Sequence, residues 1–247
     1  MDLALTGRRA LVTGASSGLG LGCAQALAAE GAEVTLVARD AERLAAAAAT
    51  IASSTHTLVG DLSDLDAIAG LVAAADDLMG GVDILIVNAG GPPAGTFGTI
   101  AFQQYEAALR LNLLSGVALF QAALPAMRER GWGRVVAITS TSVREPIGNL
   151  ILSNTARAGF TAFLKTVATE IAGDGVTVNS LQPGLHVTDR ITNLYGDTGS
   201  LAAGVPTHTL GDPGDFGRIA AFLCSDSAKY ITGTAIPVDG GAVRGLQ

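Results

Sequence analysis

Ser153 and Arg157 lie one helical turn apart in the stretch NLILSNTARAGF, residues 149–160. From Ser153 onward, positions 153, 157, 160, 164, 167 and 171 have the spacing of one helix face, and the last four are apolar. An arginine on a buried face needs a polar partner, because desolvating its charge alone is costly. The first turn of this face must therefore either reach solvent or meet a polar site.

The composition indicates a globular protein. Of the 247 residues, 49% are hydrophobic and 15% are charged, which excludes a disordered chain and allows one sizeable α/β domain or two small ones. The net charge of −7 argues against a nucleic-acid partner. Cys23, Cys224 and three scattered histidines offer neither a disulfide framework nor a metal site. Without a signal-peptide pattern or a long uninterrupted apolar run, we expect a cytoplasmic protein with no membrane partner.

Short β-branched, apolar runs alternate with longer Ala-rich helical segments, and no linker or repeat divides the chain. Apolar residues at consecutive positions are typical of strands covered on both faces. The pattern predicts an α/β fold, a doubly wound parallel sheet that binds ligands at the carboxyl ends of its strands. The expected strands are 9–14, 33–38, 56–60, 83–88, 134–140, 176–182 and 235–239.

The first expected strand leads directly into TGASSGLG, residues 13–20, and then into a helical segment. Gly14, Gly18 and Gly20 allow a tight turn, close approach of the backbone to a phosphate and close helix packing. An ordinary strand-to-helix turn would need some of the same glycines. No Lys-Ser/Thr pair follows, so the loop is not that of a nucleoside-triphosphate-binding protein.

Further motifs appear in order along the chain. They are GDL (60–62), VNAG (87–90), LNLLSG (111–116), ITS (138–140), VNSLQPG (178–184) and IPVDGG (236–241). Together with TGASSGLG they resemble the short-chain dehydrogenase/reductase superfamily in its short, single-domain type. The resemblance covers essentially the whole chain. It implies one Rossmann-type domain over 1–247 with about seven strands, an NAD(P) cofactor, a small-molecule substrate and a homotetramer.

The resemblance also assigns cofactor-binding residues by position. Asn88 has a second interpretation, in which it only ties neighbouring strands together. The implied set is Gly14, Ser16, Ser17, Gly18, Leu19 and Gly20 at the pyrophosphate, Asp61 and Leu62 at the adenine, Asn88, Ala89 and Gly90 below the ribose, and Pro183, Gly184 and Thr188 beside the nicotinamide.

The residues after the second strand select the cofactor. Enzymes that use NAD place an acid here for the ribose hydroxyls, whereas NADP enzymes accommodate the 2′-phosphate with an arginine. Ala38 stands at the usual position of the acid, and Arg39 follows it. This favours NADP(H), with NAD(H) as the alternative because Asp40 is adjacent. Asp40 would equally well cap the next helix.

The family's usual active site is Asn-Ser-Tyr-Lys, and this chain departs from it. Asn112 and Ser140 match the first two residues, but Ser153 stands at the Tyr position and Arg157 at the Lys position. Arg157 is therefore expected to bind ribose hydroxyls or a phosphate. A serine hydroxyl is a far weaker acid than a phenol, so Ser153 cannot replace the tyrosine as proton donor. A subgroup similar to 3-oxoacyl-[acyl-carrier-protein] reductases has this Ser/Arg pattern.

Three functions remain open. The chain reduces a carbonyl or conjugated carbonyl with NADPH, taking its proton from water or from a group such as Ser140, His186 or Tyr195. Alternatively it catalyses a non-redox elimination, cyclisation or isomerisation, or it binds NADP(H) without catalysis. A mobile substrate lid is expected near 188–209, where Gly, Thr and Asp are frequent. Among the three candidate proton donors, His186 has a competing interpretation, because a histidine in a loop more often lies at the surface.

The sequence also contains a cluster of arginines that an acidic carrier protein would recognise. Arg128, Arg130 and Arg134 follow one another within a few positions. An ordinary solvated helix end explains the same residues.

The missing acid at Ala38 and the charge of Arg39 lead to a test of cofactor preference. We expect NADPH to bind more tightly than NADH by about 1.5–3 kcal/mol, the range for hydrogen bonds to charged groups. Arg39→Ala should remove most of that difference and leave NADH binding unchanged. Fluorescence titration of both reduced cofactors measures it, and equal affinities in the unmodified protein would contradict the assignment.

Overall fold

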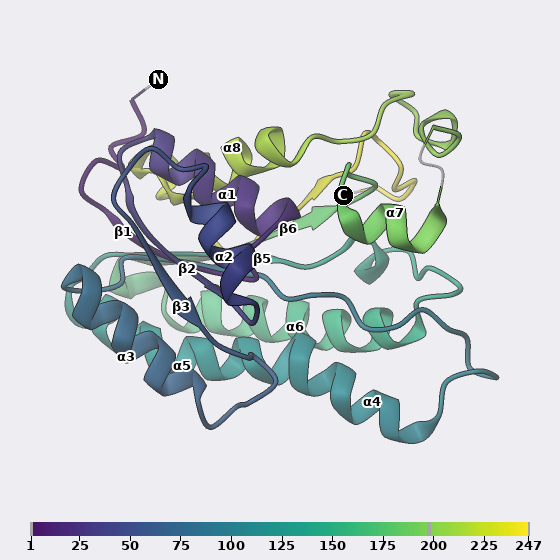
Figure 1. Ribbon diagram of the computed structural model, residues 1–247, viewed down its shortest axis with the longest axis horizontal. Coiled ribbons are helices and arrows are strands. Elements are labelled where there is room, and N and C mark those ends of the chain that lie inside the picture. Colours follow the sequence, from purple (N-terminus) through teal and green to yellow (C-terminus); the bar gives the residue numbers. More distant parts are fainter. Residues whose placement is uncertain (1, 197–198, 247) are drawn as a thin grey trace.

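The computed structural model describes residues 2–196 and 199–246 and is built on a seven-stranded parallel sheet (Figure 1). The strand order is β3-β2-β1-β4-β5-β6-β7, so the order reverses between β1 and β4. This confirms the predicted doubly wound α/β fold. The strands are β1 (Arg9–Thr13), β2 (Glu33–Ala38), β3 (Thr55–Val59), β4 (Ile84–Val87), β5 (Gly133–Ile138), β6 (Val176–Pro183) and β7 (Ala235–Val238).

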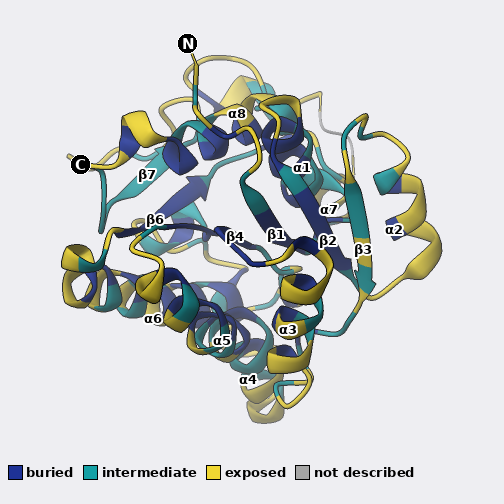
Figure 2. Ribbon diagram, turned by 90° about the vertical axis from the view of Figure 1, so that its left-hand side faces the viewer, coloured by how far each residue is buried: buried dark blue, intermediate teal, exposed yellow. Residues whose placement is uncertain are grey.

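Helices cover both faces of the sheet (Figure 1). One face carries α1 (Gly18–Ala29), α2 (Ala41–Ala48) and α8 (Pro213–Cys224), and the other carries α3 (Ile68–Met79), α4 (Phe102–Leu109), α5 (Ser115–Glu129) and α6 (Ile151–Glu170). Figure 2 shows the buried strands between these two layers. The short helix α7 (Asp189–Tyr195) lies apart from both, beyond the carboxyl ends of the strands.

Each side of the sheet has its own hydrophobic core. Leu27 of α1 and Phe216 of α8 are buried on one side. On the other side Phe120 of α5 packs edge-to-face against Phe160 of α6, with 6.3 Å between ring centroids. The apolar stripe of α6 therefore faces the core, and the same face begins with Ser153 and Arg157, which are 5% and 8% exposed. The stripe does not end in solvent but at a buried polar site.

Local sequence explains where several helices begin and end. The carboxylate of Asp40 caps α2 by accepting from the backbone N–H groups of Glu42 and Arg43, both at 3.0 Å. Asp212 caps α8 in the same way, and Pro213 follows it at the first helical position. Helix α3 ends at Gly80, whose φ of 73° favours glycine.

The helical run Phe102–Glu129 is long and apolar enough, by length and composition, to cross a membrane. Its most apolar window is 44% buried inside the protein, and Leu119, Phe120 and Met127 lie in the second core. It therefore packs as a core helix. A π-helical turn, Arg110–Leu114, separates α4 from α5, and the N–H of Ser115 donates to the carbonyl of Arg110 five residues earlier.

Helices α1 and α8 pack backbone to backbone through glycines. A Cβ atom at Gly217 would lie 2.1 Å from the carbonyl oxygen of Gly22, and one at Gly22 would lie 2.2 Å from the carbonyl oxygen of Pro213. Neither position has room for a methyl group. This contact holds the helix that follows the glycine loop against the first core.

Gly217→Ala should lower the free energy of unfolding by about 1–3 kcal/mol or more, because the added methyl group forces α8 away from α1. The matched control is Gly70→Ala in α3, where a Cβ atom meets nothing within 4 Å. That change should stabilise the protein by about 0.5–1 kcal/mol through helix propensity. Urea denaturation of both variants measures the difference. A neutral Gly217→Ala would contradict the packing argument.

Candidate functional site

A cavity of about 1260 Å³ opens at the carboxyl ends of the strands, next to the point where the strand order reverses. This is where doubly wound sheets bind ligands. Most of the predicted site residues line it, whereas Gly20 and Asn112 do not. Those lining it are Gly14, Ser16, Ser17, Gly18, Leu19, Arg39, Asp61, Leu62, Asn88, Ala89, Gly90, Ser140, Ser153, Arg157, Pro183, Gly184 and Thr188.

The glycine loop forms one wall of the cavity. Gly14 has a φ of +57°, and a Cβ atom there would lie 2.8 Å from the side-chain nitrogen of Asn88. A Cβ atom at Gly20 would lie 2.3 Å from the carbonyl oxygen of Gly14. Gly20 thus lets α1 pack against the end of β1, while Gly18 leaves the loop backbone open to the cavity. Such a loop before a helix N-terminus suits a pyrophosphate.

Asn88 ties β4 to β1. Its side-chain N–H donates to the carbonyl of Gly14 at 3.0 Å, and its backbone N–H donates to the hydroxyl of Thr13 at 2.9 Å. Asn88 therefore does tie neighbouring strands together. Since Asn88 also lines the cavity, the contact with a bound cofactor stays a prediction.

Asp61, Leu62 and Arg39 line the part of the cavity where the adenine is predicted to bind. The carboxylate of Asp61 accepts from the backbone N–H of Ser63 at 2.9 Å and from its hydroxyl at 2.8 Å. These bonds and the charge of Arg39 lower the pKa of Asp61. Leu62 is buried and Arg39 is exposed. The carboxylate of Asp40 is occupied by its capping bonds, so Arg39 presents the free charge at the end of β2.

Arg157 is buried beneath the cavity without a carboxylate partner among the described residues. Its guanidinium donates to the carbonyl of Ile138 at 2.7 Å and to that of Ala89 at 3.3 Å. It thereby bridges the ends of β5 and β4. Burial lowers the pKa of Arg157 to about 10, and the nearby charge of Arg190 acts in the same direction. Within the protein, the polar partners of Arg157 are thus backbone carbonyls, and contacts with ribose or phosphate stay a prediction.

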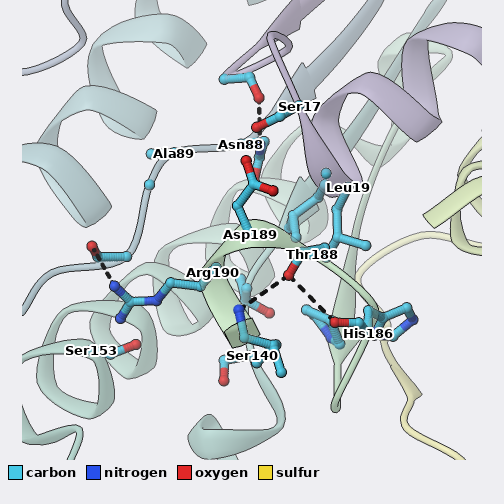
Figure 3. Close-up of a pocket in the computed structure, with 18 of the residues that line it drawn as sticks. Ser17, Leu19, Asn88, Ala89, Ser140, Ser153, His186, Thr188, Asp189 and Arg190 are labelled. Carbon is cyan, nitrogen blue, oxygen red and sulfur yellow. Dashed lines mark hydrogen bonds between the residues drawn. The ribbon is translucent and has the colours of Figure 1, made fainter. Parts of the chain in front are cut away.

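Two hydroxyls lie on the same side of the cavity as Arg157. The oxygen of Ser140 accepts from the backbone N–H of Ser142 at 3.1 Å, which leaves the Ser140 proton free to be donated. Ser153 lines the cavity from the first turn of α6. Figure 3 shows the hydroxyls of Ser140 and Ser153 in the lower part of the close-up, away from Ser17 and Asn88.

Asn112 lies in the π-helical turn and is 5% exposed. Its side-chain N–H donates to the carbonyl of Gly90 at 2.8 Å, and its buried side-chain oxygen has no hydrogen-bond partner among the described residues. Asn112 supports the site from behind and does not line the cavity. Its unused oxygen marks a place for a donor such as a water molecule.

Arg190 joins the site from helix α7, and sequence reasoning missed it. Its guanidinium donates to the carbonyl of Gly91 at 3.2 Å and to that of Pro92 at 2.8 Å. Burial lowers the pKa of Arg190. In Figure 3 its side chain extends across the pocket, on the same side as Ser153. The available signal was that Arg190 is the only Lys or Arg between 188 and 209.

The expected mobile lid begins as an ordered helix. Thr188 caps α7 by accepting from the N–H of Ile191 at 3.4 Å, and Asp189 forms an ion pair with Arg43 of α2 at 3.0 Å. A Cβ atom at Gly18 would lie 3.3 Å from the Thr188 methyl group, so the helix start touches the glycine loop. Later comes a short 3-10 turn, Ala202–Gly204. Residues 197–198 lie outside the described residues.

His186 does not lie at the surface. It is 3% exposed and packs edge-to-face on Phe216, with ring centroids 5.1 Å apart. Its Nδ1 lies 3.3 Å from the carbonyl oxygen of Gly184. Burial lowers the pKa of His186 below its ordinary value of 6.5. It is therefore mostly neutral at pH 7, and it packs the segment that follows β6 against α8.

The three clustered arginines are each paired with an acid. Arg128 binds Asp174 at 2.6 Å, Arg130 lies 3.5 Å from Asp83, and Arg134 lies 3.3 Å from Asp226. Arg134 is also buried, at 3% exposure, so the interpretation as a solvated helix end is wrong for it. Because each of the three has an acidic partner within the chain, their clustering in the sequence does not by itself indicate a carrier-protein site.

The fold and the cavity define a dinucleotide-binding α/β protein, and its relatives define the family. Residues 14–243 match the family described as enoyl-(acyl carrier protein) reductase. Nodulation protein G of Azospirillum brasilense is 35% identical, with 94% of this chain and 96% of the relative covered. Dehydrogenase/reductase SDR family member 4 of Sus scrofa is 34% identical, covering 98% and 89%. The chain belongs to the short-chain dehydrogenase/reductase family.

Solved structures support the same family assignment. L-Sorbose reductase from Gluconobacter frateurii, complexed with NADPH and L-sorbose, is 31% identical and covers 100% of both chains at a TM-score of 0.93. A 3-oxoacyl (acyl-carrier-protein) reductase from Agrobacterium tumefaciens C58 with NADP bound is 32% identical, with 97% and 95% covered and a TM-score of 0.92. These structural neighbours are reductases that hold NADPH or NADP.

The burial of His186 predicts a pH dependence of stability. Because the folded-state pKa lies below 6.5, the unfolded chain binds more protons in the window below that value. The free energy of unfolding should be highest above pH 6.5 and fall as the pH drops toward the folded-state pKa. His186→Gln should be less stable at pH 7.5 but lose less stability between pH 7 and 5. Denaturant titrations at several pH values measure this, and parallel profiles would contradict it.

Proposed function

We propose that this chain is an NADPH-dependent reductase of a carbonyl or conjugated carbonyl substrate in which water, and not residue 153, supplies the proton. One observation carries the proposal. A single cavity is lined at one end by the glycine loop and at the other by Ser140, Ser153 and Arg157. The residues that the family resemblance implies at the cofactor are present, whereas a serine stands where the resemblance implies a tyrosine beside the substrate.

The residues present fit a nicotinamide dinucleotide. Gly14 and Gly18 form a cradle that a side chain would fill, and Thr188 lies beside it. Arg39 lies where a 2′-phosphate would be bound, and its neighbour Asp40 is committed to the cap of α2. Arg157 and Asn88 would hold the ribose. The NADPH and NADP of the structural neighbours support the same choice.

NADPH, when bound, supplies a hydride to the carbonyl carbon. The chain's own task is then to stabilise the negative charge that develops on the carbonyl oxygen. Ser140 is set up as a donor, because its oxygen already accepts from Ser142 and its proton is unused. The buried charge of Arg157 stabilises the same oxygen electrostatically, and low-dielectric surroundings strengthen that effect.

The proton that completes the alcohol comes from bulk solvent and is relayed by water in the space beside Ser153, so that no hydroxide is left in the site. A serine side chain is shorter than a tyrosine by most of a ring, so a water molecule has room there. The hydroxyl of Ser153 is too weak an acid to donate its own proton near neutral pH. Ser153 would then orient the water by a hydrogen bond and make a small contribution.

The proposal also covers the substrate lid, the oligomeric state and the location of the protein. The segment 188–209 is the substrate lid on a single domain, 1–247, and α7 is its ordered start. The chain assembles as a homotetramer in the cytoplasm, with α4, α5 and α6 pairing across one two-fold axis and β7 near another. Phe102 of α4 and Leu114, 85% and 42% exposed, are apolar side chains available to such an interface.

The two serines should respond differently to substitution. Ser153→Ala should reduce kcat/KM less than about tenfold, or about 1.4 kcal/mol, whereas Ser140→Ala should cost more because it removes the donor to the reacting oxygen. Arg157→Ala should weaken cofactor binding and turnover together. The pH profile of kcat should lack the inflection of a titrating phenol. NADPH oxidation against ketones, 3-oxoacyl thioesters and conjugated enones provides the assay.

Two results would contradict the proposal. A thousandfold loss in Ser153→Ala, with Ser140→Ala nearly intact, would show that the roles of the serines are reversed. If no member of the panel is reduced while NADPH still binds, the function is instead a non-redox reaction on the same scaffold or cofactor binding alone.

A further inference from the structure

The cavity contains two guanidinium groups whose charge no described acid neutralises. Among the described residues, Arg157 donates only to the carbonyls of Ile138 and Ala89, and Arg190 only to those of Gly91 and Pro92. Both line the cavity, and the charge of Arg190 lies close enough to contribute to lowering the pKa of Arg157. Keeping the buried guanidinium of Arg157 near the half-buried one of Arg190 costs free energy that an anion would recover.

The acids that line the cavity are all engaged elsewhere. Asp40 caps α2 and Asp61 accepts from Ser63. Asp189 is paired with Arg43 at 3.0 Å, and Glu145 accepts from the backbone N–H of Arg244 at 2.8 Å. Among the described residues, no ion pair involves Arg157 or Arg190. Because none of these acids pairs with Arg157 or Arg190, both guanidinium groups are available to a bound anion.

We propose that the substrate of this reductase carries a carboxylate, and that Arg190 is the residue that binds it. The inference rests on the proposed function and names its substrate class, an oxo acid. A guanidinium has five N–H donors in a planar fork that matches a carboxylate, and Arg190 uses two of them on backbone carbonyls. Its remaining donors serve the ligand.

The position of Arg190 favours the substrate over the cofactor's phosphates. The pyrophosphate belongs at the glycine loop, which Thr188 touches at the very start of α7. Arg190 instead reaches the segment Gly91–Pro92, beyond the residues expected beneath the ribose, on the side of Ser153 in Figure 3. The cavity lining also includes apolar side chains, with which the hydrocarbon part of an oxo acid would make matching contacts. The apolar lining residues are Ile147, Leu150, Leu194 and Val243.

The test compares acids with neutral analogues of the same shape. In the first arm, kcat/KM is measured for acetoacetate against methyl acetoacetate and for 2-oxohexanoate against methyl 2-oxohexanoate. We expect the acids to be preferred about ten- to hundredfold, the range for hydrogen bonds to a charged group. Arg190→Gln should abolish that preference while the Kd for NADPH, from fluorescence titration, changes less than about twofold.

The second arm does not depend on turnover. Calorimetry measures the binding of hexanoate and of hexanamide to the protein with NADP bound. Hexanoate should bind at least about tenfold more tightly in the unmodified protein, and the two should bind alike in Arg190→Gln. If no carbonyl is reduced but hexanoate still depends on Arg190, the redox proposal fails and the carboxylate site stands.

Two control variants separate charge recognition from loss of structure. Arg218→Gln removes an exposed arginine of α8 that pairs with Asp215. It should leave the acid-to-ester ratio of kcat/KM and the hexanoate-to-hexanamide ratio of affinities unchanged. Asp189→Asn breaks the ion pair that holds α7 to Arg43 but keeps Arg190. It should therefore change kcat/KM for acids and for esters by the same factor.

Three results would overturn the inference. The first is equal binding of hexanoate and hexanamide by the unmodified protein. The second is an Arg190→Gln variant that keeps its preference for acids. The third is a loss of NADPH affinity in Arg190→Gln as large as the loss of kcat/KM for acids and esters alike, because Arg190 would then serve the cofactor.

Discussion

The row of backbone carbonyls that follows β4 is the constraint on which the site depends. A buried carbonyl needs a hydrogen-bond donor, and a chain leaving a parallel strand has none from the sheet. Here each carbonyl is met by a different part of the molecule. Ala89 accepts from Arg157 of α6, Gly90 from Asn112 of the π-helical turn, and Gly91 and Pro92 from Arg190 of α7. One short segment thereby fixes three elements that are distant in sequence.

This arrangement explains why positive charge accumulates at the site. Satisfying neutral carbonyls with arginines brings guanidinium groups together without bringing carboxylates. Each carbonyl dipole compensates only part of a full charge, which is why burial lowers the pKa values of both Arg157 and Arg190. The cost of keeping both charges in one cavity is recovered when an anion enters. Structural support and ligand recognition are therefore performed by the same side chains.

The sheet and most of the cavity were predictable because their signals are local. Apolar runs of strand length, and glycines immediately after a strand, appear directly in the sequence, and the spacing of Ser153 and Arg157 placed both on the buried face of α6. Other features depend on contacts between distant segments. The burial of His186 follows from Phe216, and that of Arg134 accompanies its contact with Trp132 and its pairing with Asp226. Neither the π-helical turn at Asn112 nor the reach of Arg190 to Gly91 has a short-range signature.

The two proposed departures from the family's catalytic pattern, Ser153 and Arg157, are connected by their chemistry. In the usual pair, the lysine's charge lowers the pKa of the tyrosine as well as holding the ribose. A serine at position 153 has no pKa near the working range to be tuned, so residue 157 keeps only the tasks of supplying charge and donating hydrogen bonds. A guanidinium performs these with a rigid fork, and here the fork spans the carbonyls of Ile138 and Ala89. An ammonium group, as a compact point charge, would not match the two directions as well. Once the phenol is absent, arginine thus suits position 157 better than lysine. Its charge and the charge of Arg190 lie in the same cavity.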